Sequence, residues 1–314
     1  NRSSGVLEWD FQGSEKNWRS PVVYEESVFV GGPDGLLYSL NSLTGKLNWQ
    51  RDISSTSIGG GTLYENRLYV SSSDDNLYQL DPSTGKTLGT FDLGNGTPEN
   101  PLIEADLAYV SDRDGHLYAL NTNNKNMTWN LWTGGALHKP PIEHGGNLYV
   151  GSSDGYVYSV DKYSGSLSWS TKIGDEVIEK LFYTDGLVYA VTRNKHKLAS
   201  GDYDDIIDSS VIALDPATGN TEWIYESDTQ IAVSVVVDDS LIFVSQVDGL
   251  LHALVKPTTD GNKNKSNINE QVEEVFTPLS SKETTSILDS VFWSGTMVLG
   301  GIKSIADGSG SYTS

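Results

Sequence analysis

The sequence predicts an all-β protein built from a repeated unit of about 40 residues, and three observations support this prediction. Tyrosines recur at a constant step, at Tyr38, Tyr78, Tyr118 and Tyr158. Aspartates recur at the same step, at Asp34, Asp74, Asp114 and Asp154. Most of these aspartates precede a glycine between two short apolar runs, which is the pattern of a β-hairpin. A period of this length with three or four strands per unit is typical of a β-propeller.

The repeat is clearest in residues 146–169, where Asp154-Gly155 joins two short strands and Ser164-Gly165 leads to a third strand that carries Trp169. We name the strands of one blade A to D from the propeller axis outwards. The whole chain, residues 1–314, is then predicted to be one seven-bladed domain. The predicted blades cover residues 20–50, 59–91, 100–132, 140–170, 177–225, 231–276 and 286–314 plus 5–11.

The two ends of the chain are predicted to share the seventh blade. Residues 286–314 supply strands A and B and a candidate C strand, but no D strand follows. Residues 5–9 read as a D strand with no blade before it, and Trp9 precedes Trp49 by one repeat length. The N-terminal strand is therefore expected to complete the C-terminal blade, because such closure leaves no free sheet edge within the ring.

An insertion interrupts the fifth repeat between Thr192 and Asp208. The spacing from Asp161 to Asp215 is 54 residues instead of 40. We interpret the extra residues as a loop between strands B and C, with a basic cluster followed by an acidic one. Long loops in compact domains are frequently functional, and a tolerated surface insertion is the alternative. The candidate partner contacts in this insertion are Arg193, His196, Asp202, Tyr203 and Asp204.

The composition excludes several classes of function. The chain has a formal net charge of -21 and no cysteine, so disulfides and thiolate metal sites are impossible. Phosphate binding needs a basic surface, so nucleic acid is not an expected partner. No apolar run is long enough to span a bilayer, and no direct membrane insertion of this segment is expected. Because Asn1 is not an initiator Met, the chain reads as a processed or excised ectodomain, in the periplasm, at the cell surface or in a lumen.

The turn aspartates are the most regular polar feature, and Asp208 and Asp248 extend the series. A ring of carboxylates would attract Ca²⁺, which prefers six to eight oxygen ligands. The simpler interpretation is that each aspartate caps its own turn, since Asp commonly bonds its own backbone in turns. We favour the turn interpretation and predict no metal site.

A longer pattern runs through the repeats, with Leu-Tyr, a polar turn residue, Thr-Gly and then Trp. It covers residues 37–49, 77–89, 117–129, 157–169 and 211–223, with Gly89 in place of Trp in the second repeat. The pattern resembles the PQQ-type propeller repeat of quinone-dependent dehydrogenases and of the outer-membrane assembly lipoprotein of Gram-negative bacteria. The resemblance implies that one tryptophan per blade packs between neighbouring blades. The matching positions are Trp9, Trp49, Trp129, Trp169 and Trp223.

No catalytic set of residues is visible, so the main hypothesis is a non-enzymatic binding or scaffold propeller of the cell envelope or exterior. It would present loops to a protein, peptide or glycan. Trp18 and Trp132 lie outside the tryptophan register and are candidate contacts, together with the residues of the insertion. One alternative is a PQQ-dependent oxidoreductase with Ca²⁺ or a glycan-active enzyme, although no cofactor is expected. The other is a ligand-sensing ectodomain of a membrane receptor or kinase.

Overall fold

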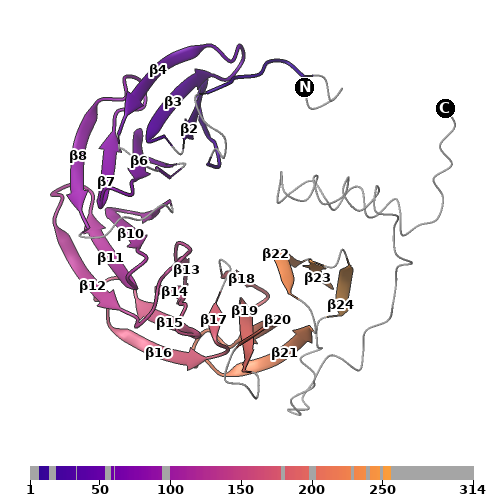
Figure 1. Ribbon diagram of the computed structural model, residues 1–314. Coiled ribbons are helices and arrows are strands. Elements are labelled where there is room, and N and C mark those ends of the chain that lie inside the picture. The colour runs from indigo at the N-terminus through magenta and orange to yellow at the C-terminus, as the bar shows by residue number, and fades with distance from the viewer. Residues whose placement is uncertain are drawn as a thin grey trace, which may run out of the picture. The chain divides into compact units, whose positions relative to one another are not determined.

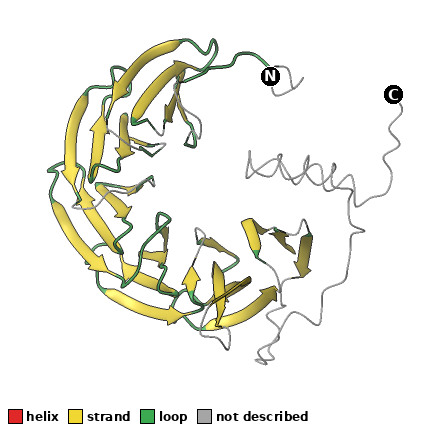
Figure 2. Cartoon of the chain, in the orientation of Figure 1, coloured by secondary structure: helices red, strands yellow, loops and turns green. Residues whose placement is uncertain are grey.

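The computed structural model describes residues 7–13, 19–32, 34–53, 58–59, 61–93, 100–177, 181–197, 203–227, 230–237, 241–247 and 250–255. These residues form strands, turns and connecting loops (Figure 2). The predicted seventh blade at 286–314, the last strand of the sixth blade and Trp18 lie outside them. The chain divides into two compact units, one of Asn1–Lys195 with Val211–Glu222 and one of His196–Ser210 with Trp223–Ser314.

The first unit contains four antiparallel sheets of four strands, each in chain order from strand A to strand D. The first and second sheets consist of β1 (Val22–Tyr24), β2 (Ser27–Gly31), β3 (Leu36–Asn41), β4 (Leu47–Asp52), β5 (Thr62–Tyr64), β6 (Arg67–Ser71), β7 (Asn76–Leu80) and β8 (Thr87–Asp92). The third and fourth consist of β9 (Leu102–Glu104), β10 (Leu107–Ser111), β11 (His116–Asn121), β12 (Met127–Trp132), β13 (Ile142–His144), β14 (Asn147–Gly151), β15 (Tyr156–Asp161) and β16 (Leu167–Lys172).

Eight further strands follow. A five-stranded sheet contains β17 (Glu176–Val177), β18 (Phe182–Thr184), β19 (Leu187–Lys197), β20 (Tyr203–Leu214) and β21 (Thr221–Ser227). A three-stranded sheet in the second unit contains β22 (Ile231–Val237), β23 (Leu241–Gln246) and β24 (Leu251–Val255). Together with the first four sheets they make an all-β architecture of the kind that a propeller requires.

The loop predicted between Thr192 and Asp208 is wrong for its described residues, 192–197 and 203–208. The insertion instead lengthens the two strands of a hairpin, since β19 has 11 residues and β20 has 12, whereas β14 and β15 have 5 and 6. Antiparallel pairing satisfies the backbone N–H and C=O groups of the added residues, which a loop leaves to water or to side chains. Arg193 and His196 consequently lie on β19, and Tyr203 and Asp204 lie on β20.

Within the first unit, neighbouring sheets contact each other through their A strands and through apolar cores between them. Strand β1 contacts β5, and β5 contacts β9. Figure 1 labels strands B to D of these first three sheets, which follow one another in chain order. One core joins Phe29 and Leu37 of the first sheet to Leu68 and Leu80 of the second. The next two interfaces have cores of the same kind. The second and third sheets are thus buried on both faces, which explains why their B and C strands read as nearly continuous apolar runs.

One contact recurs at the sheet interfaces and fixes their spacing. The Trp49 ring of β4 lies on Gly85, in the turn between strands C and D of the next sheet, and its Nε1–H donates to the Pro82 carbonyl at 3.0 Å. Trp129 repeats this arrangement on Gly165, with the Lys162 carbonyl as acceptor at 3.1 Å. Trp169 repeats it on Gly219, with the Pro216 carbonyl at 2.9 Å.

This contact requires a glycine in the turn for two reasons, because the indole leaves no room for a Cβ and because the backbone has a positive φ. A Cβ on Gly85 would stand 2.8 Å from the Trp49 ring, and one on Gly165 would stand 2.6 Å from the Trp129 ring. Both glycines also have a positive φ, of 70° and 72°. An L-residue is strained in that conformation, and the added carbon would push the indole away.

Trp9 occupies the same docking position ahead of the first sheet. Its Nε1–H donates to the Ser42 carbonyl at 3.0 Å, and a Cβ on Gly45 would stand 2.6 Å from its ring. Residues 7–13 nevertheless form no strand, so the D strand predicted at 5–9 is wrong for its described part. A strand exists only where a neighbouring strand pairs with it. Here the side chain of Trp9, rather than its backbone, holds the segment against the first sheet.

The interface between the second and third sheets uses a different solution. Gly89 stands where the other repeats have Trp, and Lys125 stands where they have the turn glycine, with a φ of 64°. The Lys125 stem covers Gly89, since a Cβ there would stand 2.6 Å from Lys125 Cε. The turn carbonyl of Thr122 is taken by the buried amide of Gln79 at 3.3 Å. Three changed residues together replace one tryptophan contact.

An ion triad around a buried lysine ties the third sheet to the fourth. Lys162 Nζ lies 2.8 Å from Glu104 of β9 and 3.0 Å from Glu143 of β13. Burial of Glu143 acts to raise the pKa of its carboxyl, but the hydrogen bonds from Lys162 and from the Gly146 N–H outweigh it and leave the pKa below its usual value. Lys162 is 7% exposed, so removing its charge would leave two carboxylates poorly compensated.

We expect Gly85→Ala to destabilise the protein more than Gly186→Ala. Gly186 also has a positive φ, of 81°, but a Cβ there meets nothing within 4 Å. Both variants bear a backbone cost of about 1–2 kcal/mol. Only Gly85→Ala adds an overpacking cost of about 1–3 kcal/mol against Trp49. Urea unfolding of both variants beside the parent measures the difference, and equal midpoints for the two variants would refute the docking contact.

Candidate functional site

One end of the sheets in the first unit gathers the turns between strands B and C and the segments that lead into the next A strand. Backbone hydrogen bonds join the two kinds of segment, from Ile53 N–H to the Gly35 carbonyl at 3.1 Å and from Thr133 N–H to the Gly115 carbonyl at 2.9 Å. We call this end the loop face. Its described residues are 32, 34–35, 72–75, 112–115, 132–141, 152–155, 173–177 and 193.

The aspartates of the loop face bond their own turns. Asp154 Oδ1 accepts the Tyr156 N–H at 3.0 Å, and its Oδ2 accepts the Tyr158 hydroxyl at 2.6 Å. Asp34 and Asp74 make related contacts, with the Leu36 N–H at 3.0 Å and the Tyr78 hydroxyl at 2.7 Å. Burial and the bond to Asp74 raise the pKa of Tyr78 to about 12. These carboxylates therefore act as turn caps and acceptors for buried tyrosines.

The third sheet departs from the sequence pattern, because Asp112 takes the role expected of Asp114. The Asp112 side chain is fully buried and accepts the His116 N–H at 2.7 Å and the Tyr118 hydroxyl at 2.9 Å. The His116 ring lies 3.2 Å from Asp112 Oδ2. In the part of the chain that the structure describes, no three His, Asp or Glu side chains are grouped as a metal site requires.

Trp132 is the largest apolar side chain exposed at the loop face. It ends β12, is 64% exposed, and its Nε1–H donates to the Asp114 carbonyl at 3.2 Å. His116 is its partner across β11 and β12. The ring is therefore held in place while its surface stays open to solvent. A fixed, exposed indole is the kind of side chain that anchors protein interfaces, since little rotamer freedom is lost on binding.

A second group at the loop face links the fourth and fifth sheets within the first unit. Glu176 of β17 lies 3.8 Å from the Arg193 guanidinium and 3.9 Å from the His138 ring. Glu176 and Arg193 are also paired across β17 and β19. Of the predicted partner contacts in the insertion, Arg193 is the one whose side chain the structure describes, and it belongs to a partly exposed ion cluster.

The other predicted partner contacts are not brought together here. His196, Tyr203 and Asp204 are described by their backbone alone, and Trp18 and Asp202 lie outside the described residues. Trp132 and Arg193 share the loop face without a direct contact. Of the tryptophans predicted to pack between blades, Trp9, Trp49, Trp129 and Trp169 make the docking contacts above, and Trp223 is buried in the second unit.

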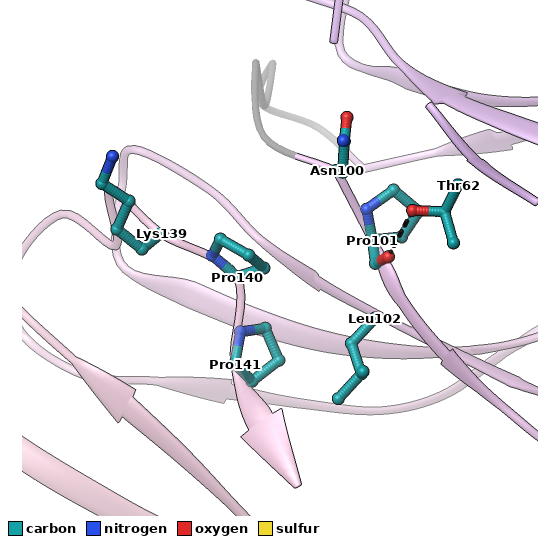
Figure 3. A pocket seen from close by; sticks show the side chains of 7 residues that line it. All are labelled: Thr62, Asn100, Pro101, Leu102, Lys139, Pro140 and Pro141. Atoms are coloured by element: carbon teal, nitrogen blue, oxygen red, sulfur yellow. Dashed lines mark hydrogen bonds between the residues drawn. The ribbon is translucent and has the colours of Figure 1, made fainter. Parts of the chain in front are cut away.

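A pocket of about 390 Å³ opens where the A strands of the second, third and fourth repeats begin, and we call it the mouth pocket (Figure 3). Two cross-sheet hydrogen bonds build one wall. The Gly61 N–H donates to Asn100 Oδ1 and the Thr62 hydroxyl donates to the Pro101 carbonyl, both at 2.8 Å. The pocket is lined by Thr62, Asn100, Pro101, Leu102, Lys139, Pro140 and Pro141.

Sequence reasoning missed this pocket, although a signal for it exists. Residues at the start of the A strands follow the repeat, with Pro21, Pro101 and Pro141 spaced by one or two repeat lengths. Proline has no N–H to leave unsatisfied there and fixes φ, so it suits the first residue of an inner edge strand. Small or ring-shaped residues at that position leave a gap between neighbouring strands.

The fold defines a PQQ-type repeat protein of the propeller class. A family model described as outer membrane protein assembly factor BamB matches residues 56–138 and 130–261. Because these matches span well over half of the chain, the chain belongs to this family. No curated protein sequence matches the chain significantly.

Solved structures of the same fold include BamB from Moraxella catarrhalis, which is 21% identical, with a TM-score of 0.57 over 73% of this chain and 67% of that one. The computationally designed Ika8 protein is 15% identical, with a TM-score of 0.55 over 80% of this chain and 87% of that one. At these identities the likeness concerns the fold. Among the described residues, no helix has the length and apolarity needed to cross a membrane.

Proposed function

We propose that this chain is a non-enzymatic binding propeller of the cell envelope or exterior, which presents its loop face to a protein partner. The single observation that carries the proposal is Trp132, an exposed indole with a fixed orientation at the loop face. The ion cluster around Glu176 supplies polar contacts on the same face. The family description, an outer membrane protein assembly factor, supports a protein partner and an envelope location.

A propeller suits this role because its turns stand on a rigid frame of paired strands. At the loop face the aspartate and tyrosine contacts fix the turns, so that little conformational entropy is lost when a partner docks. The tyrosine hydroxyls are occupied by acceptors and their pKa values are raised, which makes them unsuitable as bases at neutral pH. Recognition, rather than chemistry on a substrate, is what such a surface supports.

We also propose that the complete chain forms a closed ring of seven blades, with the N-terminal segment completing the last blade. Trp9 supports this, because it repeats the docking contact that the last strand of a preceding blade makes elsewhere. Closure pairs the edge strands that an open ring would expose.

Photocrosslinking tests the partner proposal. The photoreactive residue p-benzoylphenylalanine replaces Trp132 in one variant and Tyr163 in a control, in cells that produce the chain. Tyr163 is 67% exposed but lies in a turn between strands C and D, away from the loop face. We expect a discrete crosslinked protein from position 132 and none from position 163. Equal products from both positions, or none from position 132, would contradict the proposal.

Small-angle X-ray scattering tests ring closure. A compact domain of this length has a radius of gyration of about 20 Å. We expect the full chain to approach that value and to keep it when Trp132 is changed to Ala. Deleting residues 1–13 should raise it, because the contact of Trp9 with the turn of the first sheet is then lost. A full-length value well above about 20 Å, unchanged by the deletion, would contradict closure.

A further inference from the structure

The mouth pocket is lined by residues that take no part in the proposed binding of a protein at Trp132. Three prolines and a leucine supply most of its walls, and the side chains of Lys139 and Asn100 offer hydrogen-bond donors. From these properties we infer that the mouth pocket binds a carboxylate carried on an apolar, ring-containing body. This goes beyond the proposed function, because the ligand is a small acid and the site lies at the inner ends of the A strands rather than on the outer strand that carries Trp132.

The walls of the pocket favour a flat apolar group. Pro140 and Pro141 stand on one side and Pro101 and Leu102 on the other (Figure 3). Proline side chains lose almost no conformational entropy on burial, so these walls hold their spacing without a ligand. A volume of about 390 Å³ lies within the range of small-molecule pockets. An aromatic or alicyclic ring between the prolines would bury apolar surface on both of its faces.

Lys139 supplies the charge. Its side chain rises beside Pro140 (Figure 3), and within the described residues its ammonium has neither an ion pair nor a hydrogen bond. That is notable in a chain with 42 acidic and only 21 basic side chains, where Lys162 already engages two glutamates. The flexible four-carbon stem of a lysine lets its ammonium turn towards a bound anion.

The side-chain amide of Asn100 supplies a second donor, and a hydrogen bond holds that amide in place. Its Oδ1 accepts the Gly61 N–H at 2.8 Å, which fixes the amide and leaves its Nδ2 group to donate. The Thr62 hydroxyl already donates to the Pro101 carbonyl. One cation and one amide N–H match the two oxygens of a carboxylate. A phosphate is a poorer fit, because its recognition draws on bidentate arginines or rows of backbone N–H groups, and neither lines the pocket.

Isothermal titration calorimetry with 3-phenylpropionate tests the inference on the intact chain. The acid should bind, while the neutral 3-phenylpropanamide and the cationic 3-phenylpropylamine should bind at least about tenfold more weakly, since charge-assisted hydrogen bonds are the stronger kind. Lys139→Gln should weaken binding of the acid by roughly 10- to 100-fold. Lys86→Gln is the matched control, because Lys86 is an exposed lysine in the turn before β8 and should leave binding unchanged.

The outcomes separate this inference from the proposed function. Thermal melts of both lysine variants establish that they are folded, so that lost binding reports on the pocket. Equal binding of acid and amide, equal affinity of Lys139→Gln and the parent, or no heat at acid concentrations up to about 5 mM would overturn the inference. In any of these cases a crosslink at position 132 would still stand, because that position does not line the pocket.

Discussion

The contact between a tryptophan of one sheet and the turn glycine of the next is the interaction on which the rest of the structure depends. It combines three requirements at one point: an indole face on a bare Cα, an indole N–H on a turn carbonyl, and a positive φ at the glycine. Tyr109 donates its hydroxyl to the same Lys162 carbonyl that Trp129 reaches. Each interface that has this pair is thereby fixed at the turn between strands C and D, and the loop face lies at the opposite end of the sheets.

The interface between the second and third sheets shows that the tryptophan and the turn glycine are required together, since both are absent there. Because Gly89 stands at the tryptophan position, no indole ring lies on the next turn, and a lysine, Lys125, fits where the other turns have glycine. The orphaned carbonyl of Thr122 would be costly if left unpaired, and the buried Gln79 amide satisfies it. Gln79 also donates to the Tyr69 hydroxyl at 2.8 Å, which anchors the amide on its own sheet. The chain therefore keeps the spacing of the interface with different atoms.

Much of the fold was predictable because each repeat places the same residue types at the same buried and turn positions. The 40-residue step of tyrosines, turn aspartates and tryptophans reports strands buried on both faces and turns with fixed angles. Gln79 could not have been predicted, since its role depends on a carbonyl in the next sheet. Asp112 takes the role expected of Asp114 through a two-residue shift of the carboxylate within one turn, which leaves the repeat length unchanged. The insertion was misread as a loop because polar and charged residues dominate it, a composition that paired strands can share with a loop.

Of the candidate site, the sequence identified Trp132 as lying outside the tryptophan register, and the structure places it at the loop face with an exposed ring. The mouth pocket depends on three segments that are each one repeat apart, and a sequence shows their spacing without showing the gap between them. The family match gives the class of protein, whereas the partner depends on side chains that differ from repeat to repeat.

A double-mutant cycle at Gly89 and Lys125 tests the central claim most directly. Gly89→Trp alone meets the Lys125 side chain, and Lys125→Gly alone uncovers Gly89 and exchanges a packed stem for a bare turn. If the tryptophan and the glycine form one unit, the two changes together should restore the packing of an indole on a turn glycine seen at Trp49 and Gly85. The account predicts a favourable coupling energy of about 1 kcal/mol or more in urea unfolding. Additive effects, with no coupling between the two positions, would contradict it.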